Sequence, residues 1–301
     1  MRGIVTVLNT PFTDADTVDC GALARHAVLA LDAGVAGFLV PAMAAEVWKL
    51  TDEERDGMVR AVVEAIDHKV PVIGGASAAT QAERLQNARR LAALGCDVVL
   101  VSQPFISEEQ YIREIGDIAL ASGLPLMIQD WDATGSGVPI PAILGAFKAV
   151  DQLKYLKVET ADAGHKYTAL KRATGGELHV SGGWAVTQLI EALDRGVDAF
   201  MPTALHSVYV GIVEHYRGGN RDAAIDLFRR VLPILAFANQ NLELSIHFFK
   251  RLLWREGIYP TPRIRAPATI PDEYQMRIMD ELIDLAIALT SEQGRRWRSA
   301  R

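Results

Sequence analysis

One order of apolar and polar positions recurs three times along the chain. In each copy a leucine is followed within three residues by a glycine, and an apolar run comes next. The copies are Leu31–Val40, Leu94–Val101 and Leu193–Met201. A leucine near the end of a helix, a glycine in the left-handed conformation that closes it, and a buried strand account for this order. The repeat therefore predicts three junctions between a helix and a strand.

Apolar runs of strand length occupy five further places. They are Ile4–Leu8, Pro71–Gly74, Leu124–Ile128, Tyr155–Val158 and Leu178–Val180. Segments of helix length separate the resulting eight strands, and this alternation indicates a parallel sheet covered by helices. Eight such units favour an α/β fold closed into a (β/α)₈ TIM barrel, with a doubly wound open sheet as the competitor. No G-x-G-x-x-G follows the first strand, so the main reason to prefer the open sheet is missing.

Helix signals continue after the barrel pattern ends. Thr51–Glu54 and Ser107–Gln110 fit the capping box that begins a helix. Further apolar helices are expected over 220–240, 242–256 and 271–291. We therefore predict a barrel over residues 1–218 and a C-terminal helical extension over 219–301 that packs on it.

Composition narrows the class of protein. The 301 residues are 50% hydrophobic and carry a formal net charge of −6. This mild charge argues against a nucleic-acid partner, and no apolar run reaches membrane-spanning length. The cysteines, Cys20 and Cys96, have neither zinc-ligand spacing nor the number for a disulfide framework. We expect a cytoplasmic protein that holds no metal.

Lys157 lies where a lysine is difficult to explain. Period-two alternation along 153–160 places Tyr155, Lys157 and Glu159 on one face of a strand. A lysine near the carboxyl end of a buried strand is costly unless it is paired or used. Two interpretations stay open: an ion pair with Glu159, or an amine that attacks a 2-oxo acid at the mouth of a barrel. The second needs no metal or organic cofactor.

Four segments, in this order, resemble the dihydrodipicolinate synthase and N-acetylneuraminate lyase family. Thr10–Phe12 matches its Thr-Pro-Phe, Leu50–Arg55 its Leu-Thr-x-x-Glu-Arg, and Pro71–Gly75 its third strand. Leu156–Glu159 matches the strand that bears the family's Schiff-base lysine. The resemblance covers nearly the whole chain. It implies a (β/α)₈ barrel, class I lyase chemistry at Lys157, and a homo-oligomer, either a dimer or a tetramer.

The sequence departs from the family at four places. The carboxylate-binding Gly-Thr-Thr-Gly-Glu is Ala42–Glu46 here, and the Tyr-Asn after the fifth strand is Gln129-Asp130. The arginine that binds aspartate semialdehyde falls at about Ala133, and Pro-Tyr-Tyr is Pro104–Ile106. These changes argue against dihydrodipicolinate synthesis and against sialic acid cleavage.

The candidate site combines these positions with the residues near them. The predicted catalytic residues are Lys157, Asp130 and Gln129; the predicted substrate-binding residues are Met43, Ala44, Glu46, Glu159, Ser181, Gly182 and His206. Gln129 can orient a substrate but cannot relay protons. Asp130 is either an acid or base in place of the lost tyrosine or a turn residue, and His206 is either a titrating site residue or a hydrogen-bonded structural one.

The remaining positions divide between support and binding. Glu46 is expected mainly to support its loop, while the backbone amides of Met43 and Ala44 could bind a carboxylate. Ser181 and Gly182 occupy the family's substrate-contacting turn, although small residues there also serve close packing.

Three functions from different classes follow. The leading one is a Schiff-base-forming lyase that acts on a small-molecule 2-oxo acid, most plausibly a 2-keto-3-deoxy sugar-acid dehydratase. Losing the relay tyrosine weakens aldol chemistry, so a pyruvate-releasing aldolase is the alternative. A non-catalytic barrel that binds a 2-oxo acid and a protein that interacts through its apolar C-terminal helices are the others.

Overall fold

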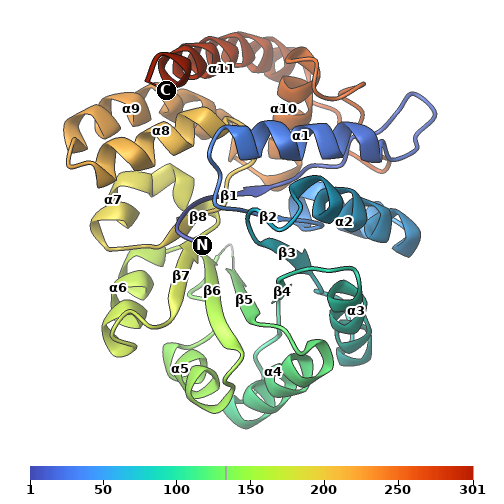
Figure 1. The fold of residues 1–301 in the computed structure, drawn as a ribbon, viewed down its shortest axis with the longest axis vertical. Helices are drawn as coiled ribbons and strands as arrows, with labels where there is room; N and C mark the ends of the chain where they lie inside the picture. Colours follow the sequence, from blue (N-terminus) through green and yellow to red (C-terminus); the bar gives the residue numbers. More distant parts are fainter. Residues whose placement is uncertain (133, 301) are drawn as a thin grey trace. The chain divides into compact units, whose positions relative to one another are not determined.

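The computed structural model describes residues 1–132 and 134–300, apart from the side chains of 184–185 and 295–300. The described residues form a closed barrel of eight strands in sequential order (Figure 1). The strands are β1 Gly3–Val7, β2 Gly37–Leu39, β3 Val72–Gly75, β4 Val98–Val101, β5 Leu126–Asp132, β6 Leu153–Thr160, β7 His179–Gly182 and β8 Ala199–Phe200. The predicted (β/α)₈ fold is confirmed, and every predicted strand has a counterpart within a few residues.

A helix follows each strand in the direction of the chain. The α-helices are α1 Cys20–Asp32, α2 Asp52–Ile66, α3 Gln81–Ala93, α4 Glu108–Ser122, α5 Ile140–Ala149, α6 Ala163–Ala173, α7 Leu189–Asp194, α8 His206–Arg217, α9 Arg221–Ala238, α10 Leu242–Arg255 and α11 Glu273–Ala300. Short 3₁₀ turns are η1 Met43–Ala45, η2 Val47–Lys49 and η3 Trp184–Gln188. Helices alone follow β8, as the change of pattern near residue 218 predicts.

The three glycine junctions adopt the backbone that the repeat requires. Gly34, Gly95 and Gly196 have φ angles of 91°, 88° and 76°. An L side chain is strained in this left-handed region, whereas glycine enters it freely. Each glycine therefore ends its helix and turns the chain into the next strand.

The predicted capping boxes differ in outcome. Thr51 and Glu54 form both reciprocal hydrogen bonds at the start of α2. At the start of α4, the Ser107 side chain accepts from the Gln110 amide, but the Gln110 side chain donates to Glu114. Thr80 and Glu83 form a complete box at the start of α3 that the prediction did not include.

The chain forms two compact units. One comprises residues 1–2 and 71–201, and the other comprises residues 3–70 and 202–301. In the first unit, consecutive helices from α3 to α7 pack side by side. In the second, α1 packs on α2, and α8 packs on β1, α9 and α11. The boundary predicted between residues 218 and 219 stays a prediction.

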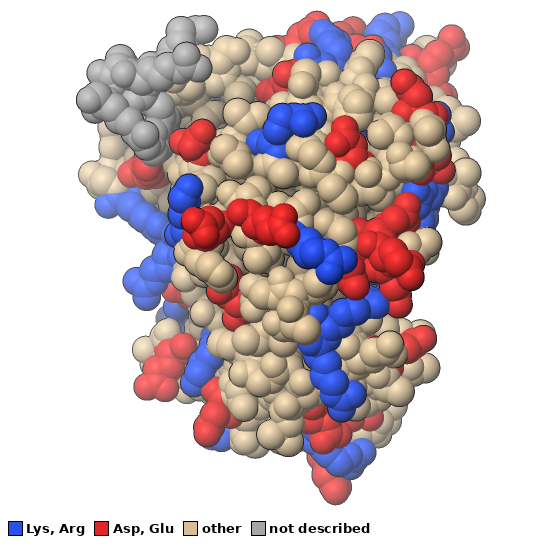
Figure 2. Space-filling view, turned by 45° about the vertical axis from the view of Figure 1, so that its right-hand side comes forward, with Lys and Arg blue, Asp and Glu red and all other residues tan. Residues whose placement is uncertain are grey.

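Charged side chains are interspersed by sign on the face of the molecule drawn in Figure 2. No broad area of that face is occupied by Lys and Arg alone. None of the described helices combines the length and the apolar composition that crossing a bilayer requires.

Candidate active site

Lys157 lies on β6 in the first compact unit, and β5 and β7 are the strands on either side of it. The register of the parallel strands pairs Gln129 of β5 with Lys157 of β6, and Lys157 with Ser181 of β7. Residues paired in this way project to the same face of a sheet. Gln129, Lys157 and Ser181 therefore form one row across three neighbouring strands, near their carboxyl ends.

The amine of Lys157 is buried and is paired with a carboxylate. The residue is 4% exposed, and its Nζ atom lies 3.1 Å from Oε1 of Glu159. The other oxygen of Glu159 accepts a hydrogen bond of 2.6 Å from Nε2 of Gln129. The Glu159 carboxylate thus joins the lysine to the amide, and the ion pair that the sequence left open is present.

Glycine at position 183 leaves the space that Glu159 fills. A Cβ atom added to Gly183 would overlap the Glu159 carboxylate. Its φ angle is −80°, so the backbone itself does not require glycine. The constraint at Gly183 is therefore the close approach of a side chain, which helps to hold the carboxylate beside Lys157.

Polar groups of Ser181 and Gly182 are engaged within the barrel. The Ser181 hydroxyl is fully buried and donates to the carbonyl of Leu156 at 3.1 Å. The Gly182 carbonyl accepts from the Met201 amide at 3.0 Å. These contacts fit close packing of the strands, which was the second of the two roles expected for this turn.

Asp130 belongs to a different set of contacts from Lys157. Its register partner is Val158, and one of its oxygens lies 2.5 Å from Nζ of Lys166 in α6. The other oxygen accepts from the Val138 amide at 2.8 Å. Burial raises the pKa of Asp130, while Lys166 opposes that rise. Both oxygens are occupied, so the geometry favours a role in fixing the loop after β5 over the predicted acid or base role.

A pocket of about 590 Å³ opens in the same unit. The loops after β3 and β4 and the end of β5 line it, and Gln129 is among the lining residues. Gln129 thus contacts both the pocket and the carboxylate of Glu159. Arg84 and Gln103 also line the pocket, although the sequence prediction did not include them. A sequence signal for Arg84 exists: it shares the buried face of α3 with Ala88 and Leu91.

The turn expected to bind a carboxylate lies in the second compact unit. Met43 and Ala44 begin η1, and both are partly exposed. The Asn9 side chain donates to the Ala44 carbonyl at 2.7 Å, and the Thr10 hydroxyl donates to the Ala45 carbonyl at 2.6 Å. The segment that follows β1 therefore fixes the turn. Carboxylate binding by its amides stays a prediction.

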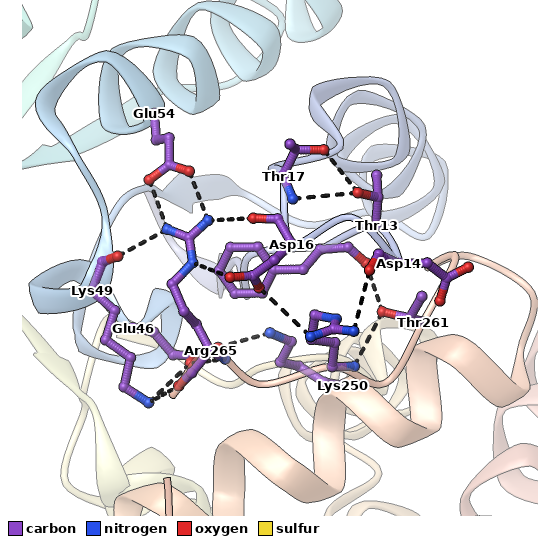
Figure 3. A network of polar contacts seen from close by, with 12 residues as sticks. Thr13, Asp14, Asp16, Thr17, Glu46, Lys49, Glu54, Lys250, Thr261 and Arg265 are labelled. Atoms are coloured by element: carbon purple, nitrogen blue, oxygen red, sulfur yellow. Dashed lines mark hydrogen bonds and ion pairs between the residues drawn. The ribbon is translucent and has the colours of Figure 1, made fainter. Parts of the chain in front are cut away.

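Glu46 anchors this turn to the C-terminal part of the chain (Figure 3). Its carboxylate is fully buried, 2.7 Å from Nζ of Lys250 and 3.2 Å from Nζ of Lys49. It also accepts from the Arg265 amide at 3.1 Å. Burial lowers the pKa of Lys250 to about 8, although Glu46 opposes that shift. These contacts are those of the supporting role expected for Glu46.

Arg265 extends the cluster of Figure 3 to neighbouring segments. Its guanidinium bonds both oxygens of Glu54 in α2, at 2.7 and 2.8 Å, and its charge lies over the ring of Phe12. Side-chain hydrogen bonding to Arg265 lowers the pKa of Glu54. The loop before α11 is therefore joined to the loop around Asp16 and to α2 within this unit.

His206 belongs to a buried chain of hydrogen bonds, and both nitrogens of its ring have partners. Its Nδ1 atom is 3.1 Å from the Thr6 hydroxyl, and its Nε2 atom is 2.9 Å from Nε2 of His26. The other nitrogen of His26 is 3.1 Å from the Tyr259 hydroxyl, which donates to the Asn9 carbonyl. These contacts support the structural alternative for His206 over its predicted place in substrate binding.

This chain fixes the tautomers of both rings when they are neutral. The Tyr259 hydrogen goes to a carbonyl, so Nδ1 of His26 must donate to Tyr259 and its Nε2 must accept from His206. Nδ1 of His206 then accepts from Thr6. Burial lowers the pKa of His206 to about 4 and lowers that of His26 well below its usual value.

Ala133, where the family's arginine falls, lies outside the described residues.

Comparison with known proteins identifies the family. A model described as the dihydrodipicolinate synthetase family matches residues 1–284. Together with the closed barrel, this match defines a (β/α)₈ enzyme of the lyase class, as the sequence predicted. The chain belongs to the dihydrodipicolinate synthetase family.

Individual relatives cover most of the chain. L-2-keto-3-deoxyarabonate dehydratase of Azospirillum brasilense is 27% identical over 276 residues, 88% of each chain. The 4-hydroxy-tetrahydrodipicolinate synthase of Cutibacterium acnes is 26% identical and covers 93% of this chain and 96% of its own. The chain is similar to both across nearly their full lengths.

Solved structures show the same fold. Dihydrodipicolinate synthase from Rhodopseudomonas palustris matches with a TM-score of 0.85 and 22% identity, over 95% of this chain and 97% of its own. N-acetylneuraminate lyase from Fusobacterium nucleatum matches with a TM-score of 0.83 and 17% identity, over 94% and 97%. At these identities the likeness concerns the fold alone.

Proposed function

We propose that the protein is a Schiff-base-forming lyase that dehydrates a 2-keto-3-deoxy sugar acid, with Lys157 as the nucleophile. The observation that carries the proposal is the position of this buried amine near the carboxyl end of β6, in register with Gln129 and 3.1 Å from the Glu159 carboxylate. The carboxyl ends of barrel strands are where such enzymes hold their reacting groups. The similarity to a 2-keto-3-deoxyarabonate dehydratase supports the class of substrate.

Glu159 accepts the first proton that is transferred in this mechanism. An ammonium group cannot attack a ketone, so Lys157 must lose a proton before it can form a bond to C2 of the substrate. The Glu159 carboxylate is within proton-transfer distance of that amine. The amine then attacks C2, and loss of one water molecule gives an iminium ion.

Dehydration follows from the electron demand of the iminium. A base removes a proton from C3, and the resulting enamine expels the C4 hydroxyl, which leaves as water after it gains a proton. Glu159 fits this proton exchange better than Asp130 does, since the oxygens of Asp130 are occupied by Lys166 and Val138. Gln129 holds the Glu159 carboxylate in place through its 2.6 Å hydrogen bond. Hydrolysis of the unsaturated iminium regenerates the lysine.

Reductive trapping tests the nucleophile. The protein is incubated with pyruvate and borohydride, and the adduct is located by intact mass and peptide mapping. We expect one reduced pyruvyl group, on Lys157, and none in Lys157→Met. The matched control is Lys154→Met, because Lys154 is an exposed lysine on the same strand. Trapping on another lysine, or undiminished activity in Lys157→Met, would refute the proposal.

Product analysis separates the dehydratase from the alternatives. Incubation with a panel of 2-keto-3-deoxy acids should yield dehydrated products and no free pyruvate. Pyruvate release would instead identify an aldolase. Trapping without turnover of any substrate would identify a barrel that binds 2-oxo acids but does not transform them.

We also propose that the protein is a homo-oligomer, a dimer or a tetramer. Apolar side chains after β4 support this, since Ile106 is 71% exposed and Phe105 is 39% exposed. Light scattering on the purified protein gives the molar mass directly, and a mass of 32.8 kDa would refute this assembly. A cytoplasmic location stays an expectation from the sequence.

A further inference from the structure

Arg84 is a buried cation that forms no ion pair with a carboxylate in the part of the chain that the structure describes. The residue is 5% exposed, and no carboxylate of the described residues lies within ion-pair distance, 4.0 Å, of its guanidinium. One terminal nitrogen donates to Oε1 of Gln81 at 3.3 Å, and the other donates to the Ala79 carbonyl at 3.1 Å. Its Nε atom is buried and has no hydrogen-bond partner among the described residues.

Two nearby acids, Glu114 and Glu83, act on this guanidinium by charge, but neither forms an ion pair with it. Glu83 is held by Thr80 in the capping box of α3. Glu114 accepts hydrogen bonds from the side chains of Gln103 and Gln110. Burial is the largest influence on Arg84 and lowers the pKa of the group, while the charges of Glu114 and Glu83 oppose that shift. A buried charge of this kind costs free energy unless it is paired with an ion of opposite sign.

The position of Arg84 indicates that a bound ligand supplies the negative charge that pairs with it. Arg84 lines the 590 Å³ pocket to which Gln129 also contributes. Cavities of several hundred Å³ are the usual size for small-molecule sites, and this one has room for a sugar acid. The pocket therefore places a cation at one point of its lining and the partner of Glu159 at another.

The side chain of Gln103 lines the same pocket and also has a polar atom available to a ligand. Gln103 is 4% exposed, and its side-chain nitrogen donates to Glu114. Its Oε1 atom is buried, and no described residue forms a hydrogen bond with it. An amide oxygen accepts hydrogen bonds, so Gln103 suits a hydroxyl group of a ligand.

Asp132, the acidic residue among those that line the pocket, already accepts hydrogen bonds through both of its carboxylate oxygens. One oxygen of Asp132 accepts from the amides of Thr134 and Gly135, and the other accepts from the amide of Gly137. These hydrogen bonds lower the pKa of Asp132 and direct its charge toward its own loop. Asp132 therefore leaves Arg84 available to an anionic ligand.

We propose that Arg84 binds a second anionic group at the far end of the substrate, and that Gln103 accepts a hydrogen bond from a neighbouring hydroxyl. The substrate is then a hydroxylated 2-oxo acid with a carboxylate or phosphate on its terminal carbon. This inference rests on the proposed function, because it extends the site of Lys157 through Glu159 and Gln129 to the pocket.

A matched set of substrates tests the inference. Three 2-keto-3-deoxy acids of equal carbon number are compared, with a terminal carboxylate, phosphate or neutral alcohol. We expect kcat/KM for one of the two anionic substrates to exceed that for the alcohol by tenfold or more, as a rough estimate for a charge-assisted contact. The better anion identifies the source of the charge. Equal kcat/KM values for all three would overturn the proposal.

Variants of Arg84 assign the preference to this residue. Arg84→Met should lose most of the advantage of the anionic substrate, mainly through KM, so that kcat/KM for the anionic substrate falls toward that for the neutral alcohol. Arg84→Lys keeps the charge and should keep part of the preference, and it remains informative if the methionine variant does not fold. Arg89→Met is the control, since Arg89 is exposed on the same helix. An equal loss for all substrates would indicate a purely structural role and would refute the inference.

Pyruvate trapping separates the two proposals. Pyruvate has no distal group, so borohydride should trap it on Lys157 equally well in the wild type and in Arg84→Met. Normal trapping, combined with equal kcat/KM for anionic and neutral substrates, would refute the role of Arg84 and leave the proposed function standing. Failure of trapping in the wild type would refute the proposed function itself.

Discussion

Nζ of Lys157 lies 3.1 Å from Oε1 of Glu159, and the two residues are separated by one position on the same strand. Alternation along β6 places both side chains on one face, while Gln129 of β5 binds the second carboxylate oxygen. The ion pair and the catalytic amine, which the sequence presented as alternatives, are compatible in this arrangement, because the carboxylate that pairs with the ammonium can also accept its proton.

Glu159→Gln should slow both Schiff-base formation and turnover. The amide keeps the size of the side chain but cannot take up a proton, so we expect kcat to fall by roughly 10² to 10⁴. Pyruvate trapping on Lys157 should also become slower, because Glu159 takes the proton that the amine must lose before it attacks. Steady-state kinetics and intact mass on the same preparation measure both effects, with the exposed Glu177→Gln as the control. Unchanged kcat would exclude Glu159 from proton transfer.

Gly183→Ala should impair the site through Glu159. The added methyl group would overlap the Glu159 carboxylate, which must then move away from Lys157. We expect turnover to fall at least about tenfold, the scale of losing one charged contact, with only a modest change in unfolding temperature. Gly116→Ala is the matched control, since its added methyl group would meet only Val150 at an ordinary 3.8 Å. Equal activity in the two variants would contradict this role of Gly183.

Breaking the Asp130–Lys166 pair should destabilise the fold. Both side chains are buried, at 0% and 7% exposure, and their charged atoms lie 2.5 Å apart. Lys166→Met leaves the Asp130 charge buried and unpaired, which typically costs about 3–5 kcal/mol. Urea unfolding measures the free energy of unfolding. Arg229→Met is the control because its pair with Asp226 is about 70% exposed, and it should cost less than about 1 kcal/mol.

The same pair also tests the role of Asp130 in catalysis. Asp130→Asn should unfold more easily, but its folded fraction should retain wild-type kcat within a few-fold. A loss of kcat on the scale expected for Glu159→Gln, with the fold intact, would restore Asp130 as an acid or base. Circular dichroism and active-site titration by pyruvate trapping give the folded fraction.

Acid should destabilise the protein through His206 and His26. The pKa of buried His206 is about 4 in the folded protein against 6.5 for an unperturbed histidine. The unfolded chain therefore binds more protons below pH 6.5, so stability is complete above pH 6.5 and is lost as the pH falls toward 4. For His206 alone the loss approaches about 3 kcal/mol. The lowered pKa of His26 adds to it.

Urea unfolding at several pH values measures this loss. In His206→Gln the free energy of unfolding should depend less steeply on pH between 6.5 and 4, whatever its value at neutral pH. His68→Gln should keep the wild-type slope, because His68 is exposed. Identical slopes in His206→Gln and the wild type would mean that His206 does not titrate in this window.

The strand and helix pattern was predictable because it depends on local rules. Alternation, helix periodicity and the three glycines that end helices indicated all eight strands and the helix-length segments between them. Strand ends were less accurate. The sequence indicated that the fifth strand ends at Ile128, whereas β5 continues to Asp132 because it pairs with β6 as far as Thr160. Pairing between strands is a tertiary contact, and a single polar segment does not encode it.

The sequence by itself determined the barrel, the family and the strand face that Lys157 shares with Glu159, since each follows from local patterns and motifs along the chain. The tertiary structure decided which polar groups are occupied. It bound Asp130 to Lys166 and His206 to His26, and among the described residues it placed no carboxylate within ion-pair distance of the buried guanidinium of Arg84. The reason is that a partner for a buried charge comes from residues distant in sequence, and only folding fixes the distances that make the pairing favourable.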